Sequence, residues 1–320
     1  MGCYLVTGIA GFIGSAVAGA LLEQGHEVVG LDNLTTGRLE KVPAGALFVR
    51  GDCQDGGVYE SALPRRAYDA VLHIAGQSSG EISFDDPVYD LRTNAESTLR
   101  LLRFSLSVGC GRFLYASSMS VYGNPETPVV SEDAPARPLS FYGVGKLASE
   151  HYLRLYGQYG IRSTALRLFN VYGEGQNMEN MRQGMVSIYL AMMVGEGRIL
   201  VKGSPERFRD FVHIADVVDA FLRCLDHPES EGREINIGGS GRVRVGDLVD
   251  RLCALSSLPV EVEYRGGTPG DIFGIAADRS LASACLGYAP SVSLEQGLAR
   301  MYAWHTSCQD AGTAPPAGTP

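Results

Sequence analysis

Short apolar runs alternate with amphipathic stretches along the first half of the chain. Runs rich in β-branched and other apolar residues predict strands at residues 4–7, 28–31, 47–49, 70–74, 113–117 and 164–169. Helical patterns, such as the one over residues 15–23, separate these runs. The alternation predicts an α/β protein with a doubly wound parallel sheet and helices on both faces.

The pattern becomes irregular after Phe169, where Gly and Asn are frequent in residues 173–184. Shorter elements follow and predict a smaller second lobe. Residues 211–225 look like a strand end that runs into a helix of the first lobe, so the lobes would interleave in sequence. We predict a first domain of residues 1–169 and 210–238, an interleaved α/β substrate domain of residues 170–209 and 239–309, and a surface tail of residues 310–320.

Composition and charge restrict the class of protein. The chain has 320 residues, 45% hydrophobic and 20% charged, which suffices for a core of ordinary size. A net charge of -9 argues against a surface that binds nucleic acid or anionic lipid. The longest apolar stretch, residues 185–194, is too short to cross a bilayer, and we expect no signal peptide. We therefore expect a cytoplasmic protein with no nucleic-acid or membrane partner.

The seven cysteines lie apart, without a C-x-x-C pair, and the histidines lack the H-E-x-x-H spacing. We therefore expect a reduced compartment and no metal site.

A glycine-rich turn follows the first predicted strand directly. Gly8, Gly11 and Gly14 form a G-x-x-G-x-x-G pattern, and Phe12 and Ile13 begin the helix that follows. Glycines permit a tight turn and let the backbone touch a pyrophosphate, which the helix N-terminus attracts. The same pattern alone would also fit a βα turn without a ligand. The acidic residues that follow favour the cofactor site.

Asp32 ends the second predicted strand, about eighteen residues after the last glycine. An acidic side chain there binds both adenosine ribose hydroxyls and repels a 2′-phosphate, which favours NAD over NADP. Asp52 ends the next strand and either reaches the adenine or only terminates the strand. Asn33 and Cys53, next to these two carboxylates, complete this part of the predicted cofactor site.

Tyr142 and Lys146 form a Y-x-x-x-K pattern at the start of a predicted helix, one turn apart on the same face. An ammonium beside a phenol lowers the phenol pKa, so that the phenolate can take a proton from a hydroxyl group. Chance matches to this pattern are common. The preceding dinucleotide-type turn favours the catalytic interpretation over a purely structural helix.

Together these motifs resemble extended short-chain dehydrogenases/reductases of the NAD-dependent epimerase/dehydratase family. The glycine spacing is the variant of that group, and residues 117–123 are similar to the segment that carries its third catalytic group. The resemblance implies a Rossmann-type fold, NAD as cofactor, and Ser118, Tyr142 and Lys146 as catalytic residues. Ser118 would bond the reacting sugar oxygen, and Lys146 would also hold the nicotinamide ribose.

Further matches extend the resemblance over nearly the whole chain. Residues 70–76 look like the fourth strand and the loop over the cofactor, which adds Ala75 and Gly76 to the cofactor site. His73 in this strand is interpreted as a packed residue. Asn94 matches a cofactor-loop asparagine, although a position on a helix surface stays open.

The resemblance also implies a site for a nucleotide-diphosphate sugar. Asn170 matches the asparagine that binds the diphosphate, and Arg209 matches the arginine that clamps it. Arg207 is either a second clamp or a solvated charge. Asp271 belongs to the closing Gly-Asp motif of the family.

Two departures leave the nucleotide base open. Thr268 stands where an arginine often precedes the Gly-Asp motif, and Ser78 stands where some members have lysine. Arg265 could substitute for the missing arginine.

The position after Ser118 separates the reactions of the family. Dehydratases carry an Asp-Glu pair there and decarboxylases a glutamate, whereas this chain has Met119-Ser120. Without that acid, a 4-keto sugar can rotate and regain its hydride on the other face, which implies a 4-epimerase that regenerates NAD. The alternatives are a 4-ketoreductase, an epimerase of a hexuronate or at another carbon, and a regulatory or scaffold protein that only binds the cofactor.

The resemblance further implies a homodimer, formed by the helices that follow Thr93 and Tyr142. Leu99, Leu102 and Leu106 have the spacing for such a face, although the same leucines could cover the sheet instead.

Overall fold

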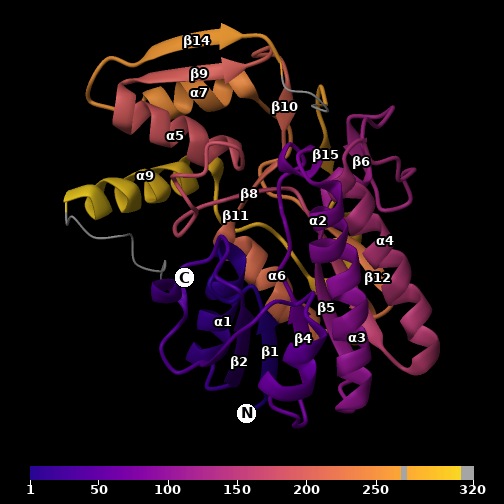
Figure 1. The fold of residues 1–320 in the computed structure, drawn as a ribbon. Helices are drawn as coiled ribbons and strands as arrows, with labels where there is room; N and C mark the ends of the chain where they lie inside the picture. Colours follow the sequence, from indigo (N-terminus) through magenta and orange to yellow (C-terminus); the bar gives the residue numbers. More distant parts are fainter. Residues whose placement is uncertain (268–271, 311–320) are drawn as a thin grey trace.

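The computed structural model describes residues 1–267 and 272–310, and side chains up to Cys308 (Figure 1). The described residues build one large sheet in which every neighbouring pair of strands is parallel. Its strand order is β12-β7-β5-β4-β1-β2-β3. The strands are β1 (Cys3–Thr7), β2 (Glu27–Asp32), β3 (Leu47–Arg50), β4 (Ala70–His73), β5 (Arg112–Ser118), β7 (Arg162–Leu168) and β12 (Arg233–Ile237).

Helices cover both faces of this sheet, because its strands are apolar on both sides. Successive residues of β1 point in opposite directions: Leu5 packs with Leu101 and Phe104, whereas Val6 packs with Val17 and Phe221. One face carries α1 (Phe12–Glu23), α6 (Ile214–Asp226) and α8 (Ser280–Leu286), and the other carries α3 (Ser97–Ser107) and α4 (Phe141–Tyr156). The predicted doubly wound Rossmann-type fold is confirmed. The sequence did not identify β12.

A smaller set of elements stands above the carboxyl edge of the sheet (Figure 1). Its core contains Leu190, Val201, Leu248 and Met301. The elements are β8 (Asn170–Tyr172), α5 (Met185–Glu196), β9 (Arg198–Lys202), β10 (Phe208–Arg209), β11 (Phe211–His213), β13 (Val243–Arg244), α7 (Val245–Cys253), β14 (Glu261–Arg265) and α9 (Leu294–Asp310). Beside the large sheet lie α2 (Pro87–Leu91) and the paired strands β6 (Val129–Val130) and β15 (Ala276–Ala277).

The chain returns from the smaller set of elements to the large sheet, as the sequence predicted for residues 211–225. Strand β11 pairs in parallel with β8, and α6 follows it directly and packs on α1. Because α8 also packs in the sheet core, two separate segments complete the first lobe. The exact domain boundaries stay a prediction.

No helix within residues 1–267 and 272–310 is both long and apolar enough to span a membrane. Residues 311–320, most of the predicted tail, lie outside the described part of the chain.

Candidate active site

Parallel strands end at the same edge of the sheet, and there the predicted site residues meet. Gly8, Asp32 and Ser118 all lie at the carboxyl ends of their strands. The described residues line three cavities along this edge, of about 410, 260 and 490 Å³, which we call the cofactor, catalytic and anchor cavities. Phe12 and Gly76 line both the cofactor and catalytic cavities, and Asn170 lines both the catalytic and anchor cavities. They therefore form one continuous cleft.

The glycine turn forms the floor of the cofactor cavity. Gly8 has a φ of +75°, and a Cβ atom there would lie 2.9 Å from the backbone nitrogen of Ala75. A Cβ at Gly14 would lie 2.1 Å from the carbonyl oxygen of Gly8. Helix α1 begins after Gly11, has no side-chain cap and has no acidic residue in its first turn. The backbone N–H groups at this helix end therefore suit a pyrophosphate, as NAD requires.

Asp32 is held at the wall of the cofactor cavity. Its carboxylate oxygens accept hydrogen bonds from the backbone nitrogens of Ala10, at 3.0 Å, and Leu34, at 2.8 Å. These bonds fix the carboxylate beside the glycine turn. The position fits the predicted contact with the adenosine ribose.

Asn33, Asp52 and Cys53 also line the cofactor cavity. The side-chain nitrogen of Asn33 donates to Asp52 at 2.8 Å. Burial favours a higher pKa for Asp52, but hydrogen bonds from Gln54 and Asn33 outweigh it and hold the pKa below its ordinary value. Burial raises the pKa of Cys53 to about 12, so this side chain is a neutral thiol.

Asn94 is buried beneath the loop that follows β4, and not on a helix surface. Its side-chain nitrogen donates to the carbonyl of Gln77 at 3.0 Å and to Asp90 at 3.2 Å. A Cβ at Gly76 would lie 2.5 Å from the Asn94 oxygen and 3.5 Å from the Lys146 nitrogen. Asn94 therefore supports the cofactor loop, where only glycine fits.

Ser118, Tyr142 and Lys146 come together in the catalytic cavity. Ser140 caps α4 by accepting a hydrogen bond from the backbone nitrogen of Gly143 at 3.1 Å, which starts the helix just before Tyr142. Tyr142 lies beside Ser118, whose hydroxyl donates to the hydroxyl of Ser120 at 3.2 Å and accepts from the backbone nitrogen of Ser120 at 3.2 Å. The Lys146 ammonium donates to the carbonyl of Ala116 at 2.9 Å.

The electrostatics of this group correct one expectation. The sequence suggested that Lys146 lowers the pKa of Tyr142, but burial raises the pKa of Tyr142 to about 12, and neighbouring Ser118 only partly opposes this effect. The ammonium lies 5.6 Å from the centre of the tyrosine ring and is bonded to a carbonyl instead. Burial also lowers the pKa of Lys146 to about 8, against the charges of Asp90 and Glu150.

The anchor cavity contains the predicted diphosphate residues. Asn170 donates to the carbonyl of Asp210 at 3.1 Å. Arg209 donates to the carbonyl of Ile272 at 2.9 Å, and burial together with neighbouring Arg207 lowers its pKa to about 10, so it stays charged at neutral pH. Arg207 is only 8% exposed, so it is not a solvated surface charge. Asp271 and Thr268 lie outside the described residues.

The sequence missed a segment that crosses the cofactor cavity. Asn177, Asn180 and Gln183 line this cavity, and Gln183 donates to the hydroxyl of Ser78 at 2.6 Å. Arg182 pairs with Asp85 at 2.6 Å and Glu81 at 3.3 Å.

On the other side of the cavity, Lys41 donates to the carbonyl of Gly175, and Arg38 pairs with Glu179. Residues 174–184 therefore bridge both walls. The high frequency of Gly and Asn in this segment is the sequence feature that could have indicated its role.

Comparison with known proteins identifies the family. The model of the NAD dependent epimerase/dehydratase family matches residues 4–238. This chain belongs to that family. The predicted family, NAD as cofactor, and an enzyme of the epimerase type are thereby confirmed.

Individual relatives cover almost the whole chain. The UDP-glucose 4-epimerase of Mycolicibacterium smegmatis is 34% identical over 303 residues, which are 92% of this chain and 96% of that protein. The structure of the Thermotoga maritima UDP-glucose 4-epimerase with UDP-glucose is 32% identical, has a TM-score of 0.89 and covers 96% of this chain and 99% of its own.

Two structures of MoeE5 are also similar to this chain. The structure with UDP-glucose and NAD is 32% identical, with a TM-score of 0.86, over 96% of this chain and 100% of that chain. The structure with UDP-glucuronic acid and NAD is 31% identical, with a TM-score of 0.85, over 96% of this chain and 99% of that chain.

Proposed function

We propose that this chain interconverts the C4 epimers of a UDP-hexose, of the glucose and galactose type, while NAD stays bound. The observation that carries the proposal is the meeting of Ser118, Tyr142 and Lys146 between the cofactor cavity and the anchor cavity. The neutral pair Met119-Ser120 after Ser118 supports epimerisation over elimination. Relatives named UDP-glucose 4-epimerase support the uridine nucleotide and the hexose.

NAD would supply the hydride acceptor and, when oxidised, a positive charge beside Tyr142 that favours the phenolate. The phenolate of Tyr142 takes the proton of the sugar C4 hydroxyl and later returns it. Because the hydride given to NAD would also return to C4, no net redox change occurs. Ser118 donates a hydrogen bond to the reacting oxygen. Lys146, on the same helix face as Tyr142, holds the nicotinamide ribose and adds positive charge.

Epimerisation requires the sugar to present both of its faces to the nicotinamide. In our proposal Asn170, Arg207 and Arg209 hold the diphosphate while the hexose turns above it. The anchor cavity, of about 490 Å³, continues from the catalytic cavity and provides room for this rotation.

We predict that a UDP-hexose carrying deuterium at C4 keeps its label through epimerisation in ordinary water. The hydride leaves C4 and returns to C4 within one active site, whereas Tyr142 exchanges only the hydroxyl proton with solvent. Mass spectrometry of the product, with a parallel reaction in heavy water, measures both effects. Solvent deuterium on a sugar carbon would indicate enolisation at another position, and an absolute need for added NADH would indicate a ketoreductase.

A UDP-hexuronate is the second candidate substrate. The observation that favours it is the binding of UDP-glucuronic acid by MoeE5, at 31% identity to this chain. Parallel assays of UDP-glucose and UDP-glucuronic acid, with products resolved by NMR, distinguish the two. Faster turnover of UDP-glucuronic acid than of UDP-glucose would make the hexuronate the preferred substrate, with the same mechanism.

We further propose a cytoplasmic homodimer. All seven cysteines are free in the described structure, which fits a reducing compartment. Val88, Leu91, Val144 and Leu155 are each more than half exposed on α2 and α4, and they supply apolar surface for a helical interface. Leu102, which the sequence left open, is fully buried against the sheet.

Light scattering at micromolar concentration is expected to give twice the chain mass of 34.2 kDa. Leu155→Glu should produce monomers, because a carboxylate in the apolar contact would lose its water. Leu258→Glu, on the smaller lobe and also more than half exposed to solvent, is the control and should stay dimeric. A monomeric wild-type protein would refute the dimer.

A further inference from the structure

A buried network of hydrogen-bonded polar side chains lies behind the catalytic residues. Ser117 directly precedes Ser118 on β5, and its hydroxyl donates to a carboxylate oxygen of Glu150 at 2.6 Å. Glu150 is on α4, one turn after Lys146, and is only 1% exposed. A single carboxylate therefore joins the strand that carries Ser118 to the helix that carries Tyr142 and Lys146.

Arg167 on β7 completes this contact. Its guanidinium donates to both oxygens of Glu150, at 2.9 and 2.8 Å, in the two-pronged geometry that suits an arginine and a carboxylate. A further nitrogen of Arg167 donates to the hydroxyl of Tyr122 at 2.9 Å and to the carbonyl of Glu132 at 3.0 Å.

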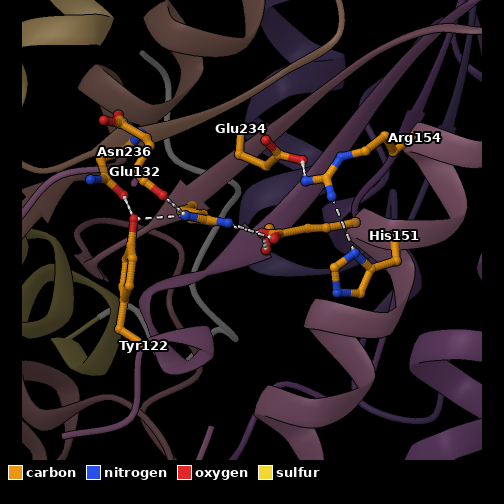
Figure 2. Close-up of polar contacts among 9 residues, drawn as sticks. Tyr122, Glu132, His151, Arg154, Glu234 and Asn236 are labelled. Atoms are coloured by element: carbon orange, nitrogen blue, oxygen red, sulfur yellow. Dashed lines mark hydrogen bonds and ion pairs between the residues drawn. The ribbon is translucent and has the colours of Figure 1, made fainter. Parts of the chain in front are cut away.

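The far end of this hydrogen-bonded network reaches β12. The hydroxyl of Tyr122 donates to Asn236 at 2.6 Å, and the backbone nitrogen of Asn236 donates to Glu132 at 2.7 Å; Figure 2 shows these three side chains close together. Tyr122 ends the turn that starts at Ser118. The network therefore ties both ends of this turn to α4, β7 and β12.

Burying such a network costs desolvation free energy, so stability of the fold alone does not explain it. A buried ion pair loses the hydration of both charges, and apolar residues of the same size often stabilise a core equally well. Burial favours a lower pKa for Arg167, but the bond to Glu150 and its charge raise it, so the guanidinium stays charged. What the network supplies, and apolar packing does not, is directional bonding. Ser117 joins β5 to Glu150 on α4, and Arg167 on β7 holds the Glu150 carboxylate in place.

We propose that Glu150, held in place by Arg167, is a positioning residue for the reaction: it sets Ser118 on β5 against Tyr142 and Lys146 on α4. The inference rests on the catalytic roles assigned under the proposed function. Ser118 and Tyr142 must share the same sugar oxygen, and a displacement of about 1 Å between catalytic groups can lower a rate about 100-fold.

Two substitutions test the proposal. Ser117→Ala removes only the link between β5 and Glu150 and leaves the ion pair intact. Glu150→Gln keeps the size of the side chain but replaces one accepting oxygen by an amide that faces the Arg167 guanidinium. We expect kcat to fall about tenfold for Ser117→Ala and about 100-fold for Glu150→Gln, with KM and bound NAD changed less than about twofold.

Glu234→Gln is the matched control. Glu234 on β12 pairs at 2.9 Å with Arg154 on α4, which lies one turn beyond Glu150 and is exposed at the surface (Figure 2). Its kcat should stay within about twofold of wild type, because this pair does not reach the end of β5. Equal losses in the control and the test variants would indicate general destabilisation of α4 and overturn the proposal.

A readout without turnover separates this proposal from the proposed function. Crystal structures of the variants should show the Ser118 hydroxyl displaced from Tyr142 relative to wild type, and the control should keep the wild-type contact. If wild type does not epimerise UDP-glucose, the proposed function fails, while these structures still decide the positioning role. An unchanged contact in Ser117→Ala and Glu150→Gln contradicts it. If Glu150→Gln does not fold, Ser117→Ala alone carries the test.

Discussion

Replacing Tyr142 by Phe is expected to lower kcat by about three orders of magnitude. Only a hydroxyl is removed, so the helix and the cavity keep their shape. The loss follows because the phenolic oxygen of Tyr142, beside Ser118 in the catalytic cavity, is the group assigned to take the C4 hydroxyl proton. Steady-state kinetics with UDP-glucose, together with the amount of NAD that copurifies, measure the effect.

Tyr152→Phe is the matched control for this substitution. Tyr152 lies on the same helix, and it packs against the core that α3 and α4 form with the sheet. Its loss of a hydroxyl should leave kcat within about twofold of wild type. Near-normal turnover of Tyr142→Phe, at full NAD content, would show that another group transfers the proton.

Gly14→Ala is expected to abolish the binding of NAD and, with it, the activity. The added Cβ would lie 2.1 Å from the carbonyl oxygen and 2.6 Å from the carbonyl carbon of Gly8. Both atoms belong to the backbone, so the whole glycine turn must move away from the position where it receives the pyrophosphate. Overpacking of this kind also destabilises the fold, by about 1–3 kcal/mol. The NAD content after purification and a thermal melt measure the two effects.

Gly19→Ala provides the comparison on the same helix. Its Cβ would come no closer than 4.0 Å to another side chain, that of Pro43. Alanine should therefore stabilise α1 by up to about 1 kcal/mol and leave NAD binding unchanged. Full NAD content in Gly14→Ala would mean that the turn tolerates the shift, and the close approach of Gly8 and Gly14 would then not be required for the cofactor.

The order of strands and helices could be predicted because burial on both faces leaves apolar runs in the sequence. Six of the strands in the large sheet were identified in this way, each within two residues of its observed limits. Strand β12, Arg233–Ile237, was missed because charged and polar residues interrupt it. Its place at the sheet edge depends on pairing with β7, a distant segment.

The parts of the site that consist of residues close in sequence could also be predicted from the sequence. The glycine turn, the acidic end of β2 and the Tyr142–Lys146 pair each consist of neighbouring residues whose geometry follows from one turn or one helix. Asn94 and Arg207 were ambiguous because their burial depends on segments that pack over them. The structure buries both, one beneath the cofactor loop and one at the anchor cavity.

Spacing and patterning along the chain specify the α/β architecture, the cofactor turn and the residues available for catalysis. How those residues behave depends on the three-dimensional packing. It raised the pKa of Tyr142 by burial, placed residues 174–184 across the cofactor cavity, and joined Ser117, Glu150 and Arg167 from three distant elements. These properties depend on desolvation and on contacts between remote segments. Neither is encoded in the local pattern of a chain.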